Sequence, residues 1–273
     1  MRVERPRRLA LLVGAVVLLI AAGSAVAWSV GANRGAVDDL LPNLTQAVPD
    51  MLSERTGGTV VAPRFFVGFQ SAAANFGTGP LIVLGRRVGV GEQEMTLRQQ
   101  IRRSDGSFRT VPLRATLQYV RSFDHSHWHV RGFMRYELRT PEGIRVVRDR
   151  KTGFCLGDRY RAELALPGQS PDPYYSDHCG KGAPGLLSIR EGISIGWGDN
   201  YTAHLEGQEL ELTSLEPGRY VLVHRVNADR DLRESDYTDN VASMAIELGW
   251  PRGPKQPPRI DVVARCPGTA TCP

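Results

Sequence analysis

Three histidines alternate with other residues in the middle of the chain. His125, His127 and His129 occupy positions i, i+2 and i+4 of the run His-Ser-His-Trp-His. In an extended strand these positions share one face, so three imidazoles would project together. Imidazole suits zinc, copper, iron and nickel, and copper(II) binds a given site most tightly. The spacing predicts a metal site; a zinc site with a reactive water and a cluster of hydrogen-bonded sheet histidines are the alternatives.

The sequence around this motif resembles the lysyl oxidases, a family of copper-dependent amine oxidases. The histidine run matches the family's H-x-H-x-H copper motif, and further segments follow in the family's order. These are KTGFCLGD at 151–158, GISIGWGDNY at 192–201, GRYVL at 218–222 and ESDYTDN at 234–240. Weaker similarity reaches back to about Phe65, so the resemblance covers nearly all of the chain beyond its N-terminal apolar segment.

The resemblance implies copper(II) bound by His125, His127 and His129. Lys151 and Tyr201 match the residues that the family joins into lysine tyrosylquinone, its built-in organic cofactor. The implied reaction converts primary amines, such as peptidyl lysine, to aldehydes, consuming dioxygen and releasing hydrogen peroxide and ammonia. A non-enzymatic metal-binding β-sandwich of the cell surface and a zinc hydrolase are the rival hypotheses.

Such a reaction needs a general base to take a proton from the amine-bearing carbon. Asp199 precedes Tyr201 by two residues and would share its face in an extended segment, so Asp199 is the first candidate. Glu137 and Asp158 are the alternatives. Each of the three could instead be a structural carboxylate that orients metal-bound imidazoles.

A second group of polar residues provides oxygen ligands. Glu234, Asp236, Asp239 and Asn240 fall within seven residues, and hard oxygen donors suit calcium. The resemblance implies a structural calcium here, completed by an Asp-Leu pair. The corresponding place is Asn43-Leu44, where an amide replaces the acid. An acidic turn after a strand explains the pattern equally well.

Four cysteines, Cys155, Cys179, Cys266 and Cys272, predict two disulfides in an exported chain. Pairing Cys155 with Cys179 and Cys266 with Cys272 keeps both loops short, although three pairings are open. Closing the first loop would stabilise the fold by about 3 to 4 kcal/mol.

The N-terminus has the pattern of an export signal. Four arginines and one glutamate in the first eight residues account for +3 of the net charge of +5. Residues 9–28 are uncharged and largely apolar, and Ala25-Val26-Ala27 favours cleavage over a membrane anchor. Either outcome makes the protein extracellular or surface-exposed. The small remaining charge predicts no nucleic-acid partner.

The rest of the chain consists of short runs rich in Val, Tyr, Phe, Leu and Thr, separated by turn residues. We predict an all-β, antiparallel β-sandwich with long ordered loops and a few short helices. The strand-forming runs are 59–69, 81–90, 114–123, 127–140, 144–149, 210–215, 219–228 and 241–248.

The turns and boundaries complete this prediction. Thr140–Gly143 and Glu216–Gly218 have the residues of hairpin turns, and 166–185 reads as a long loop. His178, His204 and His224 have no histidine neighbours and are assigned structural roles. The predicted regions are an export signal or signal-anchor (1–30), a lead-in (31–58), a lysyl oxidase-like catalytic domain (59–250) and a proline-rich, disulfide-bonded tail (251–273) that wraps the surface.

Overall fold

A computed structural model describes residues 36–121, 126–149, 153–162, 165–205 and 207–273. The export segment, His125 and Lys151 lie outside these ranges. Val37–Pro273 forms one compact unit. The described residues contain strands and no helix, so the expected short helices are absent from this part of the chain. Nothing in it has the helical length and apolarity needed to cross a bilayer.

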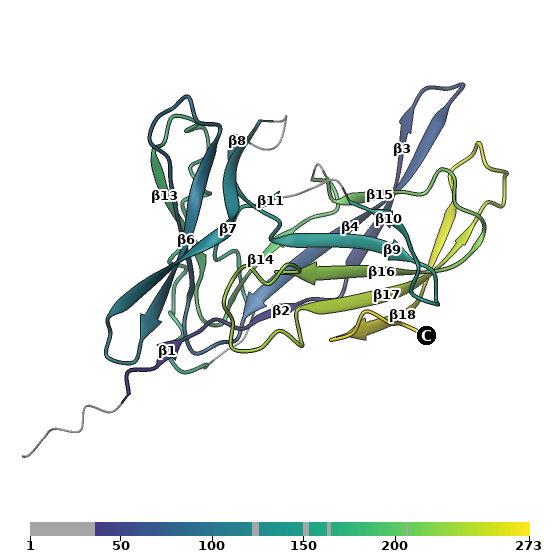
Figure 1. Cartoon of the computed structure of the whole chain (residues 1–273). Helices are drawn as coiled ribbons and strands as arrows, with labels where there is room; N and C mark the ends of the chain where they lie inside the picture. The colour runs from purple at the N-terminus through teal and green to yellow at the C-terminus, as the bar shows by residue number, and fades with distance from the viewer. Residues whose placement is uncertain (1–35, 122–125, 150–152, 163–164, 206) are drawn as a thin grey trace, which may run out of the picture. The chain divides into compact units, whose positions relative to one another are not determined.

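The strands form three antiparallel sheets (Figure 1). The strands of the first, seven-stranded sheet, in its spatial order, are β11 (Gly153–Phe154), β8 (Ser126–Arg131), β7 (Phe108–Arg121), β6 (Glu94–Arg103), β5 (Leu81–Arg86) and β13 (Ser188–Ile193), with β1 (Asp39–Leu40) paired to β6. The five-stranded sheet has the order β10 (Arg145–Arg148), β9 (Met134–Arg139), β16 (Gly218–Val226), β17 (Val241–Gly249) and β18 (Arg259–Pro267).

The third sheet is organised around the long strand β4 (Pro63–Asn75). Its order is β12 (Tyr160–Arg161), β14 (Trp197–Tyr201), β4 and β15 (Glu209–Glu211), and β2 (Leu44–Gln46) and β3 (Asp50–Gly58) also pair with β4. The all-β, antiparallel class is therefore confirmed. Strands β1 to β3 come from the predicted lead-in, so that segment supplies part of the sheets.

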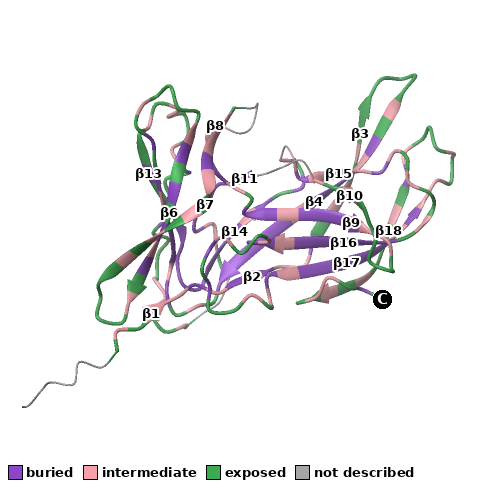
Figure 2. Cartoon of the chain, viewed as in Figure 1, coloured by how far each residue is buried: buried purple, intermediate pink, exposed green. Residues whose placement is uncertain are grey.

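One hydrophobic core joins the three sheets. Its largest buried side chains include Trp128 on β8, Tyr136 on β9, Phe69 on β4, and Phe154 on β11. Figure 2 shows the buried residues concentrated along β4, β9, β16 and β17. Burying each such side chain contributes about 1.5 to 3 kcal/mol, so strands from all three sheets depend on the same core.

The run 127–140 divides into two strands that belong to different sheets. Strand β8 ends at Arg131, β9 begins at Met134, and Gly132 between them has φ of 74°. Glycine adopts this left-handed conformation without the steric cost that a side chain imposes. The histidine strand is thereby separated from the core strand that follows it.

Two turn predictions had different outcomes. Thr140–Gly143 joins β9 to β10 in an antiparallel hairpin, as expected. The hairpin expected at Glu216–Gly218 is wrong, because β15 pairs with β4 whereas β16 pairs with β9 and β17. A turn sequence defines a local reversal but not the sheet that each flanking strand joins.

Both predicted disulfides are present, joining Cys155 to Cys179 and Cys266 to Cys272. The first holds the loop 166–185, which has no strand among its described residues. The tail does more than wrap the surface: β18 pairs with β17 along its length. This is possible because the tail's prolines lie outside the strand or at its last residue, where they remove no interior hydrogen bond.

Candidate active site

Strand β8 carries two of the three motif histidines. Antiparallel pairing sets His127 opposite Val120 and His129 opposite Gln118 on β7. The two imidazole centroids are 4.7 Å apart, and the His129 side chain is buried. The prediction that alternate histidines on a strand come together therefore holds for these two; His125 is outside the described residues.

Tyr201 meets this histidine pair from another sheet. It is the last residue of β14, and its hydroxyl lies 3.2 Å from His129 Nε2. The backbone N–H of Cys155 donates a hydrogen bond to the same hydroxyl over 2.9 Å. Burial raises the pKa of the Tyr201 phenol well above its ordinary value. The structure thus brings together two residues that are 72 positions apart in sequence.

The segment after Lys151 forms one wall of this centre. The Phe154 ring stacks on Tyr201, with centroids 3.9 Å apart. Gly153 pairs with Arg131 on β8, where a Cβ atom would lie only 2.6 Å from His129 Cβ. Glycine is therefore required for the close approach of β11 to the histidine strand, and β11 begins two residues after Lys151.

Asp199 lies on the same strand as Tyr201, so the segment is extended, which is the condition on which its assignment as the base depended. Its carboxyl is buried, and Oδ2 accepts a hydrogen bond from the Gly157 N–H over 2.8 Å. Oδ1 has no hydrogen-bond partner among the described residues, and its nearest cation is Arg159 Nε at 4.0 Å. Burial raises the pKa of Asp199 to about 8, against the opposing effect of Arg159. A carboxyl with this pKa can exchange a proton near neutral pH.

A second buried acid, Glu191, escaped the sequence analysis. It lies on β13 and is fully buried, and the Leu156 N–H donates to its Oε2 over 3.2 Å. Burial raises its pKa well above the usual value for glutamate. Ile189, Glu191 and Ile193 occupy alternate positions of β13 and are all buried, so they share one face of the strand. An acid between two apolar residues on one face was the signal in the sequence that could have revealed it.

The other two base candidates have structural partners. Both oxygens of Asp158 accept hydrogen bonds from Ser194, and Oδ2 also accepts the N–H groups of Tyr174 and Tyr175. Glu137 pairs with Arg139 on the same strand, β9, and with Arg145 on the neighbouring strand β10. Although burial opposes it, these guanidiniums and Arg225 lower the pKa of Glu137. Of the three carboxylates, Asp199 is the one on the tyrosine strand.

The first disulfide connects both sides of the centre. Cys155 donates its N–H to Tyr201, while the Cys179 carbonyl accepts the Trp128 N–H over 2.9 Å. The loop continues along β8, where Gly182 N–H bonds to the Ser126 carbonyl. The loop 166–185 is therefore a structural support for the histidine strand.

Arg87 links the loop 166–185 to Trp128 on the histidine strand. Its guanidinium carbon lies 4.8 Å from the centroid of the Trp128 ring, and the side chain is buried. It donates hydrogen bonds to the backbone carbonyls of Pro184, Leu186 and Glu92. A cation held by carbonyls in this way joins the loop to the tryptophan between His127 and His129.

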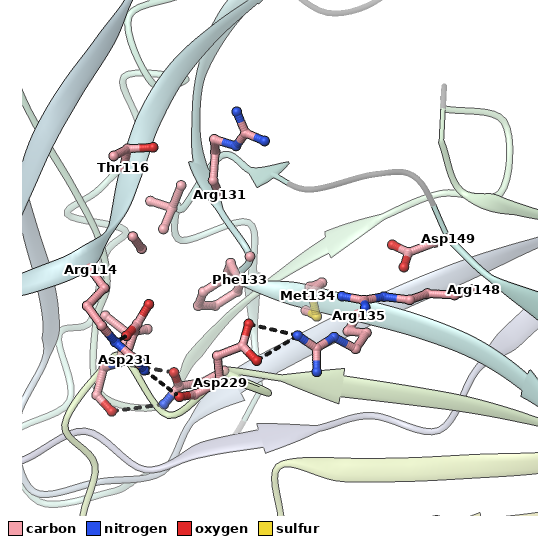
Figure 3. A pocket seen from close by; sticks show the side chains of 15 residues that line it. Arg114, Thr116, Arg131, Phe133, Met134, Arg135, Arg148, Asp149, Asp229 and Asp231 are labelled. Atoms are coloured by element: carbon pink, nitrogen blue, oxygen red, sulfur yellow. Dashed lines mark hydrogen bonds and ion pairs between the residues drawn. The ribbon is translucent and has the colours of Figure 1, made fainter. Parts of the chain in front are cut away.

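A charged pocket lies beside Phe133, which packs on Phe154 with centroids 5.4 Å apart (Figure 3). Arg135 pairs with Asp229 and Arg114 with Asp231 at its edge. Asp149 also lines the pocket, and burial raises its pKa to about 6. This solvent-accessible space is separate from the buried contact between Tyr201 and His129.

Five of the six residues predicted to bind calcium come together. Glu234 accepts hydrogen bonds from Leu44 N–H and Asn240 Nδ2, and Asp239 accepts one from Asn43 Nδ2. Asp236 is different: it is exposed, and its carboxylate accepts hydrogen bonds from Thr238. We call the five residues Asn43, Leu44, Glu234, Asp239 and Asn240 the amide-acid cluster.

The two regions offer different donor atoms to a metal. Three or more His, Cys, Asp or Glu side chains do not converge on a metal position within the described ranges. The adjacent imidazoles of His127 and His129 are nonetheless a donor type that suits copper, as it does zinc, iron and nickel. In the amide-acid cluster, Asn43 Oδ1, Asp239 Oδ1 and Asn240 Oδ1 are buried without hydrogen-bond partners in this part of the chain, which suits an oxygen-binding cation.

Comparison with known proteins adds an independent finding. The family model "Lysyl oxidase" matches residues 92–250, more than half of the chain. Lysyl oxidase homolog 2A of Danio rerio is 31% identical over 122 residues, and lysyl oxidase homolog 3 of Homo sapiens is 29% identical over 117. These alignments cover 43% and 42% of this chain but only 14% of each relative. The chain belongs to the lysyl oxidase family.

Proposed function

We propose that this protein is an exported amine oxidase that uses copper(II) and lysine tyrosylquinone. His125, His127 and His129 would hold the copper, and Lys151 and Tyr201 would form the quinone. When present, these groups supply the oxidation of a primary amine, such as peptidyl lysine, to an aldehyde, with dioxygen consumed and hydrogen peroxide and ammonia released. Family membership and the Tyr201–His129 contact support this proposal.

The observation that carries it is the 3.2 Å separation of the Tyr201 hydroxyl from His129 Nε2. A redox-active metal on the imidazole would be next to the phenol that must be oxidised. The Cys155 N–H orients the hydroxyl, and Phe154 restricts the ring by stacking. The chain therefore places a buried tyrosine of fixed orientation beside an imidazole that can bind a metal.

Asp199 is the proposed base. Burial raises the pKa of its carboxyl to about 8, so the ionised form that can accept a proton gains population as the pH rises toward 8, and the Gly157 N–H holds Oδ2 in place. Its Oδ1 is the atom that would take a proton from the amine-bearing carbon. Exclusion of water by the buried surroundings strengthens electrostatic interactions at this position.

The proposal also locates the folded unit outside the cytoplasmic membrane. The N-terminal apolar segment supports export, and the two disulfides are typical of an oxidising compartment. Cleavage of the signal is favoured over retention as an anchor. Calcium in the amide-acid cluster is a further, structural part of this proposal.

Peptide mass spectrometry tests the proposal directly. The purified protein is loaded with copper, incubated in air and digested, and a species joining the Lys151 and Tyr201 peptides is sought. The species should be absent from Lys151→Ala and present in the matched control Lys181→Ala, which alters an exposed lysine in the loop. Full copper loading without the cross-link would refute the oxidase and favour a non-enzymatic metal-binding module.

A further inference from the structure

The solvent-facing side of β6 carries arginines at regular spacing. Along this strand Met95, Leu97 and Ile101 are buried, whereas Arg98 and Arg102 on the opposite face are exposed. Four residues of extended chain separate the two arginines by about 13 Å. The alternation thus directs both positive charges away from the core.

The neighbouring strands add two arginines to this surface. Leu84 on β5 is opposite Arg98 on one side and Arg190 of β13 on the other. Arg86 follows two residues after Leu84 and faces the same way. We call Arg86, Arg98, Arg102 and Arg190 the arginine face; exposed residues along β6 and β13 are visible in Figure 2.

Two adjoining pockets lie on the arginine face and share Arg190. One is also lined by Arg86 and Arg98, and the other by Arg102. Neither has an aspartate or glutamate among its described lining residues. The pockets therefore form a continuous positively charged surface.

The four guanidiniums are available to a ligand. None of them forms an ion pair with a carboxylate in the described part of the chain. Arg98 and Arg190 donate to the neutral side chains of Thr110 and Gln100, each over 3.1 Å. Glu94, the acid on this face of β6, is paired with Arg131. Arg135, by contrast, is paired with Asp229.

Exposed aromatic rings border the same surface. Tyr174 and Phe108 line the pocket that contains Arg102 and Arg190, and they are 64% and 48% exposed. The Arg190 guanidinium carbon lies 5.9 Å from the centroid of the Tyr174 ring. Flat apolar rings next to guanidiniums can contact the C–H face of a sugar while the cations bind its acidic group.

We propose that the arginine face binds an acidic polysaccharide through its carboxylates, holding this protein on an anionic extracellular matrix or wall. Guanidiniums match carboxylates in a bidentate geometry. Strands β5 and β6 are paired on both sides, so their backbone groups cannot receive a peptide as an added strand. Recognition along β5 and β6 must therefore come from side chains, and the exposed aromatic rings beside the guanidiniums favour a sugar polymer over an acidic peptide.

The charge and geometry of this site do not depend on the oxidase proposal, whereas its extracellular ligand rests on the export that is part of the proposed function. The site also explains why net charge is a poor guide here: beyond the first eight residues the excess is only +2, yet four unpaired arginines share one surface. Position, rather than total charge, creates the attractive potential.

The test measures binding of the purified chain to polygalacturonate at physiological ionic strength, with dextran as the neutral polymer. The double variant Arg98→Gln/Arg190→Gln should weaken binding about tenfold. The control Arg219→Gln/Arg259→Gln removes the same net charge from exposed, acid-paired arginines of the five-stranded sheet and should leave binding unchanged. Circular dichroism and thermal melts establish that both variants fold.

Three results would overturn the proposal. The wild-type chain could fail to bind polygalacturonate, or the control could lose as much affinity as the double variant, which would indicate attraction by net charge alone. Equal affinity for duplex DNA with the same dependence on Arg98 and Arg190 would assign the surface to polyanions in general. Selective binding of polygalacturonate with loss only in the double variant supports it.

Discussion

We call Tyr201 with His127, His129, Phe154, Asp199 and Glu191 the Tyr201 centre. This centre and the amide-acid cluster both bury carboxylates, but the hydrogen bonds to those carboxylates differ. Asp199 and Glu191 each receive a backbone N–H on one oxygen, while the other oxygen has no hydrogen bond within the described residues. Glu234 receives donors on both oxygens, from Leu44 N–H on one and from Asn227 and Asn240 on the other. A carboxyl with one oxygen free of hydrogen bonds has an atom that can take up a proton. A carboxyl with hydrogen bonds on both oxygens instead holds together the segments that donate them.

The same chemical substitution should therefore have its main effect on a different property in each region. An acid-to-amide change preserves size and removes the charge. In the Tyr201 centre it should affect turnover, and in the amide-acid cluster it should affect the free energy of unfolding. Burial raises the pKa in both places, to about 8 for Asp199 and about 7 for Glu234, so the pKa alone does not separate them.

The largest expected effect is on catalysis. Asp199→Asn keeps an oxygen for the Gly157 N–H but cannot accept the substrate proton, so kcat should fall by about 10² to 10⁴-fold. Peroxide release from a primary amine measures this. Asp236→Asn, which changes an exposed carboxylate, is the matched control and should retain activity. Full turnover by Asp199→Asn would remove Asp199 from the mechanism.

The next effect is a pH dependence of stability. The folded-state pKa of Asp199 is raised to about 8 from the ordinary 3.8. Its contribution to stability is thus fully present below pH 3.8 and is lost as pH rises toward 8, by on the order of 1 kcal/mol per pH unit. Urea unfolding from pH 5 to 8 should show the wild type losing stability relative to Asp199→Asn. Parallel curves would mean that Asp199 is ionised throughout.

A smaller loss is expected for Glu234→Gln. Glu234 accepts hydrogen bonds from three donors, and in the variant one of these donors would face the N–H₂ group of the new amide. The free energy of unfolding should therefore fall by about 1 to 3 kcal/mol. Thermal and urea unfolding measure the change. Turnover of the folded fraction should be unaffected, and a loss of kcat without destabilisation would contradict the distinction between the regions.

The smallest effect concerns calcium. If the unpaired oxygens of Asn43, Asp239 and Asn240 bind the ion, calcium at tenfold over its Kd should stabilise the fold by about 1.4 kcal/mol. The melting temperature should rise with calcium and fall again with chelator. Asp239→Asn should reduce the response. An unchanged wild-type melting temperature at millimolar calcium would remove calcium from the proposal.

Several features followed from the sequence because they are local. The alternation of His127 and His129 on a strand and the hairpin at Thr140–Gly143 depend on side-chain periodicity or turn residues. The strand that contains Asp199 and Tyr201 was not among the predicted runs. The disulfide between Cys155 and Cys179 followed from the short loop it closes. The motifs of the lysyl oxidase family could also be identified from sequence, because each is a continuous segment of the chain.

Other features were decided only by tertiary structure. The contact of Tyr201 with His129, the burial of Glu191 and the failure of the predicted hairpin at Glu216–Gly218 depend on which strands meet across sheets. Sequence determined the residue types and the faces on which they lie, because both are set within a few residues. Packing determined their partners, protonation and water access, because burial and hydrogen bonding come from residues distant in the chain.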